Sequence, residues 1–401
     1  MNCNSVAQQG PRKNSAIIVM IAPAQTPKTA VPQQPARHLT ALDGLRAVSI
    51  SLVLLGHVSG TQGFLDLRLG RFLGDYANLG VIVFFAISGY LITTLLLDEH
   101  VRFGRVSLRL FYARRFLRLM PALLLFIGCV VGLEMAGVVR LNPGDLLAAL
   151  TYTVNFRSST GHDFGHLWSL SVEEQFYFLW PALLVLVGSR KASYAAAGML
   201  VLSPVSRLLA MQHNVPSSIF PAVADSLACG CLLAIWGDAL RRRDWYRMLL
   251  ASRWFVPVAV ILMFFCNGIR VYAVGGTLGV SAINVLCALL IHRCILVESP
   301  VTVFLSLRPL VLVGELSYSL YLWQQLFLNR HSSWAVCRFP VNLVLALLAA
   351  FASYYIVERP LNKLRRKLRP ATSAQQEAKG GLAGVYCEAG IRAGSGSVKP
   401  F

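Results

Sequence analysis

Residues 42–59 read LDGLRAVSISLVLLGHVS, an almost entirely apolar stretch that carries Arg46 near one end and His57 eleven positions later. A helix rises about 1.5 Å per residue, so the two side chains lie roughly 16 Å apart along a helix axis. Eleven residues are also close to three turns, so both side chains project from nearly the same face. In a membrane helix this places Arg46 near one surface and His57 past mid-depth, where ionisable side chains by default indicate function. The alternative is an arginine that snorkels to the interface and a histidine satisfied by a neighbouring helix.

The composition indicates an integral membrane protein. Of the 401 residues, 56% are apolar and only 14% are charged, whereas a soluble protein carries about 25% charged residues. The formal net charge is +19, but the basic residues sit between apolar segments, which is typical of membrane topology rather than of nucleic-acid binding. The nine cysteines are scattered, and even the close pair Cys229 and Cys231 lies within an apolar segment. We therefore expect core cysteines, with no metal site and no disulfide framework.

Ten apolar segments are read as membrane-spanning helices. They cover residues 44–61, 79–97, 119–139, 172–188, 194–211, 217–236, 254–269, 273–292, 309–328 and 340–357. We therefore predict an all-α integral membrane domain of about ten transmembrane helices over residues 39–369. The flanking tails, residues 1–38 and 370–401, are rich in small and polar residues and are predicted to be disordered. The N-terminal tail is interpreted as disordered or as an over-extended start upstream of the true one, and a signal peptide is the alternative.

The distribution of Lys and Arg sets the predicted orientation. An eleventh apolar segment, residues 147–156, is only ten residues long, whereas about 20 are needed to span a bilayer. If this segment does not cross and the N-terminus is cytoplasmic, the interior loops and flanks carry 21 Lys and Arg and the exterior ones carry 8. If it crosses, the counts become 11 inside and 18 outside, which violates the positive-inside rule. We therefore predict cytoplasmic termini and an exterior, partly re-entrant region at residues 141–171.

A polar cluster is predicted on the exterior side, where His57 faces the stretch GHDFGHLWSLSVEEQFYFLWP at residues 161–181. Within this stretch Glu173 and Tyr177 are four residues apart and share a helix face. Asp225 lies on the outer half of a later segment. Convergence of several ionisable side chains at membrane depth favours an active or binding site, although a water-exposed helix entry with an aromatic belt is the alternative. The candidates for contacting substrate are His166, Trp168, Ser169 and Asp225.

An arginine cluster is predicted on the interior side, in the stretch FGRVSLRLFYARRFLRLMP. Arg114, Arg115 and Arg118 stand at helical spacing before Pro121. One interpretation is plain topology and contact with anionic lipid. The other is an anion site, because guanidinium groups match phosphate oxygens bidentately. A phosphorylated donor such as coenzyme A needs such a site.

Seven motifs in a fixed order resemble those of the membrane-bound acyltransferase-3 family. They are LDGLRAVSISLVLLGH, NLGVIVFFAISGYLITTLL, FYARRFLRLMPALLL, HLWSLSVEEQFYFLWPALL, DSLACGCLLA, GELSYSLYLWQQLF and VERP, and together they run from about residue 40 to 368. Two positions depart from the family pattern. Gln324 stands where the family often has His, and Val223 stands where it often has Arg.

The resemblance implies roles for individual residues. Arg46 and His57 match the family's Arg–ten residues–His motif, which is needed for activity, and Glu173 matches the acidic residue of WSLxxE. The basic motif formed by Arg114, Arg115 and Arg118 is taken to contact acyl-CoA from the cytoplasm. The remaining motif residues are expected to pack helices, because small and aromatic residues at helix contacts usually do so. They are Ser88, Gly89, Tyr90, Tyr318, Tyr321, Glu358 and Pro360.

The family O-acylates sugars of bacterial surface glycans and some glycosylated small molecules. By resemblance, this chain is expected to move an acyl group, most simply acetyl, from cytoplasmic acyl-CoA to a sugar hydroxyl outside the bacterial inner membrane, with no bound cofactor. His57 would be the base, oriented by Glu173 or Asp225, or would carry the acyl group covalently. A transporter or flippase for a glycolipid or small solute is the alternative class, because ten spans with polar groups at mid-depth suit it too. The sequence determines neither the acceptor sugar nor the oligomeric state.

Overall fold

The computed structural model describes residues 36–64, 74, 76–268 and 274–367. In these residues every regular element is a helix. The predicted tails lie almost wholly outside the described residues, although the first helix begins at Ala36, inside the predicted N-terminal tail. The all-α prediction is therefore confirmed for the described part of the chain.

The helices fall into long ones and short connecting ones. The longer helices are α1 (Ala36–Val58), α3 (Ala77–Phe103), α4 (Leu108–Met135), α7 (Leu167–His213), α8 (Phe220–Arg241), α10 (Phe255–Gly268), α11 (Val280–Leu296), α14 (Ser317–Phe327) and α15 (Val341–Ser353). The shorter ones are α5 (Asp145–Leu150), α6 (His162–Gly165), α9 (Asp244–Ala251), α12 (Pro300–Leu305), α13 (Arg308–Glu315) and α16 (Arg359–Lys367). Single turns of 3₁₀ or π helix lie at Val154–Phe156, Val274–Gly279, Ala335–Cys337 and Tyr354–Glu358.

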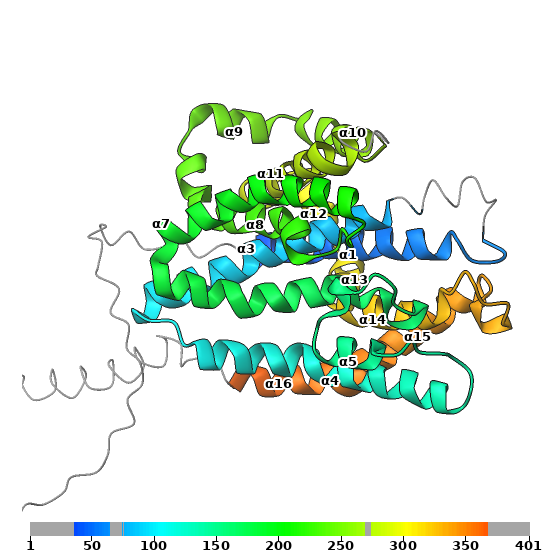
Figure 1. Cartoon of the computed structure of the whole chain (residues 1–401). Helices are drawn as coiled ribbons and strands as arrows, with labels where there is room; N and C mark the ends of the chain where they lie inside the picture. Colours follow the sequence, from blue (N-terminus) through cyan, green and yellow to red (C-terminus); the bar gives the residue numbers. More distant parts are fainter. Residues whose placement is uncertain (1–35, 65–73, 75, 269–273, 368–401) are drawn as a thin grey trace, which may run out of the picture.

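The described residues contain seven helices that are long and apolar enough to cross a membrane, or eight if the bent pair α9 and α10 counts as one span. The predicted count of ten is therefore not reached. One reason is that α7 is counted once, although it contains two predicted spans and is interrupted between them at Gly188, where φ is +77°. Figure 1 shows the chain folding back on itself at this bend. Another reason is the predicted span 309–328, which is divided between α13 and α14, helices of 8 and 11 residues.

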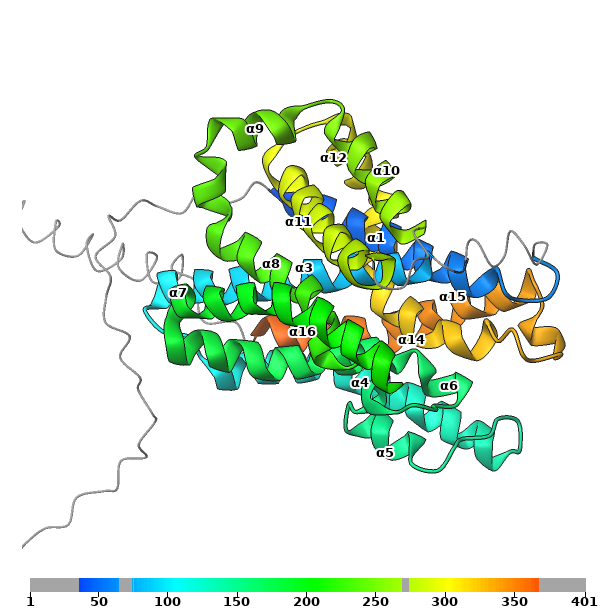
Figure 2. The ribbon, with the colours of Figure 1, turned by 45° about the horizontal axis from the view of Figure 1, so that its top comes forward.

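The segment that was predicted not to cross, residues 147–156, is built from the six residues of α5 and one 3₁₀ turn. Six helical residues extend only about 9 Å, far less than the thickness of a bilayer core. Figures 1 and 2 place α5 beside the C-terminal half of α4 and near the start of α7. The chain therefore leaves α4 and enters α7 at the same end of the bundle.

Glycines hold the central helices α3 and α8 in backbone contact. A Cβ atom on Gly89 would lie 2.1 Å from the carbonyl oxygen of Leu227, and one on Gly230 would lie 2.1 Å from that of Ala86. Small residues at membrane helix contacts allow this close approach. The prediction that Gly89 packs helices is confirmed. Cys229 and Cys231 are both buried in the same helix, as expected for core cysteines.

The bundle has two ends with different side chains, and the long helices run between them (Figures 1 and 2). We call the first the arginine end; it comprises the turn between α3 and α4, the bend at Gly188 and the C-terminus of α8. The second is the histidine end; it comprises the C-termini of α1 and α14 together with α6. Each predicted site residue can be placed relative to these two ends.

Candidate active site

A cavity of about 1970 Å³ opens within the bundle and is lined by residues of both predicted sets. Small-molecule sites usually occupy about 300–1,000 Å³, so this cavity can hold a large ligand. Arg46 and Glu173, two of the three predicted catalytic residues, line it together with the predicted donor-binding arginines, Arg114, Arg115 and Arg118. The predicted donor-binding residues and two predicted catalytic residues therefore line one and the same cavity.

The turn between α3 and α4 fixes the arginine cluster. Gly104, with φ +66°, ends α3, and the Ser107 hydroxyl accepts a hydrogen bond from an early amide of α4. The buried carboxylate of Glu99 accepts hydrogen bonds from the Ser107 amide at 2.9 Å and from Arg114 at 3.0 Å. Glu99 therefore balances the charge of Arg114. The guanidinium of Arg115 lies over the Tyr177 ring, and its buried Nε has no hydrogen-bond partner among the described residues.

Four more arginines line the same cavity and were missed as site residues. Arg102 belongs to the predicted interior arginine cluster, whereas the other three were counted only as interior loop charge, because they are far from that cluster in the chain. The parallel helices α3 and α8, held together at Gly89 and Gly230, bring their C-terminal ends to the same place. The spacing of these two glycines from the arginines that follow them was the available signal. These arginines are Arg102, Arg241, Arg242 and Arg247.

Glu173 belongs to a short hydrogen-bonded chain in the cavity. Its Oε1 accepts a hydrogen bond from the Ser88 hydroxyl at 2.6 Å, and that hydroxyl accepts one from Tyr177 at 3.0 Å. The predicted shared face of Glu173 and Tyr177 is confirmed. Glu173 was expected in the exterior cluster with His166, but it lies in the cavity with the arginines. Residues 167–181 are helical rather than a loop, so Glu173 stands about 10 Å further along the axis than His166.

Arg46 ties α1 to the start of α14. Its Nη2 donates a hydrogen bond to the Ser317 hydroxyl at 3.0 Å, and its Nη1 lies 3.6 Å from the carboxylate of Asp43. Ser317 and Asp43 thus hold the guanidinium of Arg46 in place, and the Arg46 side chain lines the cavity. A fixed guanidinium of this kind can stabilise negative charge that develops on a substrate oxygen.

His57 lies at the other end of α1, and the cavity lining does not include it. Its Nδ1 is 3.0 Å from the carbonyl oxygen of Val53. Because a carbonyl only accepts, Nδ1 must carry the proton, and Nε2 of the neutral imidazole has a lone pair. In the described structure neither Glu173 nor Asp225 bonds this ring. The orienting group expected from those carboxylates is instead the Val53 carbonyl.

The predicted substrate-binding residues are divided between several places. Ser169 lines the cavity, and its hydroxyl is hydrogen-bonded to the Tyr321 hydroxyl at 2.6 Å. His166 lies at the histidine end, where its Nε2 is 3.2 Å from the carbonyl of Leu322 and its ring is close enough to His57 for electrostatic interaction. Trp168 packs edge-on against Phe85 with ring centroids 6.2 Å apart.

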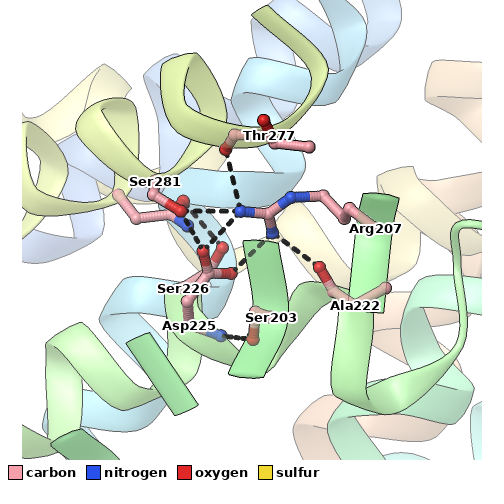
Figure 3. A network of polar contacts seen from close by, with 8 residues as sticks. Ser203, Arg207, Ala222, Asp225, Ser226, Thr277 and Ser281 are labelled. Carbon is pink, nitrogen blue, oxygen red and sulfur yellow. Dashed lines mark hydrogen bonds and ion pairs between the residues drawn. The ribbon is translucent and has the colours of Figure 1, made fainter. Parts of the chain in front are cut away.

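Asp225 is part of a buried network of polar contacts with Arg207 and Ser281 (Figure 3). Arg207 donates to its two carboxylate oxygens at 3.1 and 2.9 Å, and the Ser281 hydroxyl donates to one of them at 2.8 Å. The same guanidinium reaches the carbonyls of Ala222 and Thr277. Both members of this buried ion pair make further hydrogen bonds, which favours a structural role. The network joins α7, α8 and α11. The cavity lining does not include Asp225.

Comparison with known sequences identifies the family. The sequence model of acyltransferase family 3, described as an acyltransferase domain, matches residues 39–359. The chain belongs to this acyltransferase family. It is 29% identical over 365 residues to the O-acetyltransferase OatA of Staphylococcus aureus strain NCTC 8325, and equally to OatA of strain COL. Each alignment covers 82% of this chain and 58% of the relative, so the chain spans less than two thirds of the relatives' length. No solved structure matches.

Family membership indicates that the cavity and the long apolar helices belong to an acyltransferase domain. The acyltransferase match covers every described motif residue from Arg46 to Glu358. With seven or eight helices able to cross a membrane, the protein is a multi-pass membrane acyltransferase. In the part of the chain that the structure describes, no group of three or more His, Cys, Asp or Glu side chains could hold a metal ion.

Proposed function

We propose that this acyltransferase moves an acetyl group from cytoplasmic acetyl-CoA to a hydroxyl of a sugar on a glycan or glycoside outside the bacterial inner membrane. The observation that carries the proposal is the single cavity that joins seven arginines to Arg46 and Glu173. The names of the OatA relatives support an acetyl group transferred to oxygen. The acceptor is inferred from the family resemblance of the motifs.

The charge distribution supports the sidedness of this reaction. The arginine end carries the basic loops, which the positive-inside rule assigns to the cytoplasm. Coenzyme A is made there, and its phosphates prevent it from crossing a bilayer unaided. The last described helix, α16, ends near the arginine end in Figure 1. We therefore propose cytoplasmic termini and an exterior histidine end.

The cavity suits a phosphorylated donor. Arg115 and Arg118 on α4 line the same cavity as Arg241 and Arg242 at the C-terminal end of α8, so phosphates can be bound from both helices. Guanidinium groups bind phosphate oxygens with two parallel hydrogen bonds, which fixes orientation as well as position. The thioester end of the donor would then point toward Arg46 and Glu173, the polar side chains deeper in the bundle.

The proposed chemistry uses the lone pair of His57. In direct transfer, Nε2 takes the hydroxyl proton while the hydroxyl oxygen attacks the thioester carbonyl carbon. The resulting oxyanion collapses, the C–S bond breaks, and the imidazolium returns the proton to the thiolate. In the covalent alternative, Nε2 itself attacks the thioester and releases the thiol, and the hydroxyl then takes the acetyl group from the acyl-imidazole. The spacing of roughly 16 Å between Arg46 and His57 along α1 requires the acyl group to travel toward the histidine end in either case.

The test is turnover by the full-length protein purified in detergent. Radiolabelled acetyl-CoA is supplied with a panel of methyl glycosides and oligosaccharides, and product is separated from free acetate. We expect label in a sugar ester with the wild type and none with His57→Ala. If no acyl-CoA turns over with any glycoside, the proposal fails and the transporter or flippase hypothesis gains support. A rapid-quench sample without acceptor then separates the two routes, because only the covalent one labels the protein.

A further inference from the structure

Two sets of arginines line the cavity, and they come from different helices. The first arginine set lies on α4, and the second lies at the C-terminus of α8 and on α9. The first consists of Arg114, Arg115 and Arg118, and the second of Arg241, Arg242 and Arg247. Figures 1 and 2 place α4 and α9 on opposite sides of α3. The cavity therefore offers positive charge at two separate places.

The first arginine set lies next to the proposed reaction site. Arg115 lies over the ring of Tyr177, which stands four residues, or about 6 Å, beyond Glu173 in α7. Arg115 and Arg118 are both within electrostatic range of the Glu173 carboxylate. A phosphate group bound by this set would therefore lie close to the end of the donor that reacts.

The second arginine set lies further toward the arginine end. Gly89, the neighbour of Ser88 in α3, packs directly against Leu227 of α8. Arg241 follows Leu227 by 14 residues in the same helix, which corresponds to about 21 Å along the axis. The side chains of Arg241 and Arg247 are 46% and 61% exposed, and each forms an exposed ion pair within its own helix. Such pairs contribute little, so these guanidinium groups can turn to a bound anion.

A buried histidine gives the second arginine set a fixed hydrogen-bond donor. His292 of α11 lines the cavity, is only 5% exposed, and has its Nδ1 2.7 Å from the hydroxyl of the buried Tyr246 of α9. Its Nε2 faces α8, because a Cβ atom on Gly237 would lie 3.3 Å from it, and Gly237 is about one turn before Arg241. With the phenol donating to Nδ1, the proton of the neutral ring lies on Nε2, which can donate to a phosphate oxygen.

We propose that Arg241, Arg242 and His292 bind the 3′-phosphate of coenzyme A, and that Arg115 and Arg118 bind its diphosphate. The diphosphate adjoins the pantetheine arm that carries the thioester, and the 3′-phosphate lies beyond it on the ribose. The order of the two phosphates along the donor thus matches the order of the two arginine sets along the bundle. The second set would then make the enzyme selective for donors with a 3′-phosphate. This inference rests on the proposed transferase function.

The test compares two donors, acetyl-CoA and acetyl-3′-dephospho-CoA, which differ only in the 3′-phosphate. The full-length protein in detergent is assayed with the best glycoside of the panel. For the wild type, the KM of the dephospho donor should be at least about ten-fold higher, as expected for lost hydrogen bonds to a charged group. Arg241→Gln combined with Arg242→Gln should raise the KM for acetyl-CoA by a similar factor and change that for the dephospho donor less than two-fold. His292→Phe should show the same selective pattern.

Two further variants separate this selectivity from a general loss of charge. Arg115→Gln should raise the KM for both donors by the same factor, because both carry the diphosphate. Arg243→Gln is the matched control, since this exposed arginine adjoins Arg242 but is not among the residues that line the cavity. It should leave both KM values as in the wild type.

The inference is overturned if the wild type has equal KM values for the two donors. It is also overturned if the double variant or His292→Phe keeps the wild-type ratio of the two KM values, or raises both equally. These results leave the proposed function standing, because they are measured on an enzyme that turns over. A wild type that acetylates no glycoside from either donor overturns the proposed function itself, and the inference with it.

Discussion

The guanidinium of Arg115 lies over the ring of Tyr177, 3.6 Å from its centroid, and the Tyr177 hydroxyl donates to Ser88, which donates to Glu173. This contact connects the arginine cluster to the acidic residue in the cavity. An arginine stacked on an aromatic ring is held in place and keeps its outer N–H groups available for a ligand.

Arg115→Gln should raise the KM for acetyl-CoA by about ten-fold or more, since a hydrogen bond to a charged group contributes about 1.5–3 kcal/mol. The acceptor KM should change little, because the proposed acceptor site is at the histidine end. Arg115→Lys should restore part of the loss, keeping the charge without the fork. The matched control is Arg253→Gln, an arginine that also stacks on an aromatic ring, Trp254, but is not among the residues that line the cavity. Equal effects of Arg115→Gln on both substrates would contradict separate sites.

His57→Ala should lower kcat by a factor of about 10²–10⁴, the range of general acid–base catalysis. The melting temperature should change little, because the hydrogen bond of Nδ1 goes to the Val53 carbonyl within the same helix. Steady-state rates and thermal unfolding of the same preparation check both statements. A variant that keeps more than about a tenth of the wild-type rate would remove His57 from the chemistry.

Asp225→Asn distinguishes a structural role from the predicted substrate contact. Breaking a buried ion pair costs about 3–5 kcal/mol, so the melting temperature and the yield should both fall. The acceptor KM of the protein that remains folded should be unchanged. Asp244→Asn is the control, because the ion pair of Asp244 with Arg247 is exposed and such pairs contribute about 0–1 kcal/mol. A raised acceptor KM with an unchanged melting temperature would restore Asp225 to the acceptor site.

Sidedness can be read from single cysteines in a cysteine-free background. Ser159, between α5 and α6, is exposed at the histidine end, and Arg105, in the turn between α3 and α4, is exposed at the arginine end. Ser159→Cys should react with an impermeant maleimide on intact spheroplasts, and Arg105→Cys only after lysis. Arg105 serves better than Ser107, whose hydroxyl caps α4. Reaction of both before lysis would contradict the proposed topology.

Patterns within a single segment could be predicted from the sequence. Apolar segments gave the all-α membrane fold, and the four-residue spacing of Glu173 and Tyr177 gave their shared face. The two spans predicted within α7 lie on either side of the bend at Gly188, but hydropathy does not show that the span predicted at 309–328 is divided between α13 and α14. Segment boundaries depend on backbone geometry that composition does not encode.

Relationships between distant segments were the part that the sequence could not supply. Asp225 was placed on the outer half of its segment, but only packing of α7 against α8 makes Arg207 its partner. Arg241 was counted as loop charge until the contact of α3 with α8 brought it to the cavity. Gln324 was noted as a departure from the family pattern, whereas its burial beside His57 is visible only once α14 packs against α1.

Transfer across a sealed membrane tests the central claim most directly. The full-length protein is reconstituted in liposomes with labelled acetyl-CoA trapped inside and a glycoside acceptor outside, and His57→Ala liposomes are the control. The proposed function predicts labelled sugar ester outside the wild-type liposomes and none outside the control. Labelled ester that forms only when donor and acceptor share a compartment, or that forms equally with His57→Ala, would contradict it.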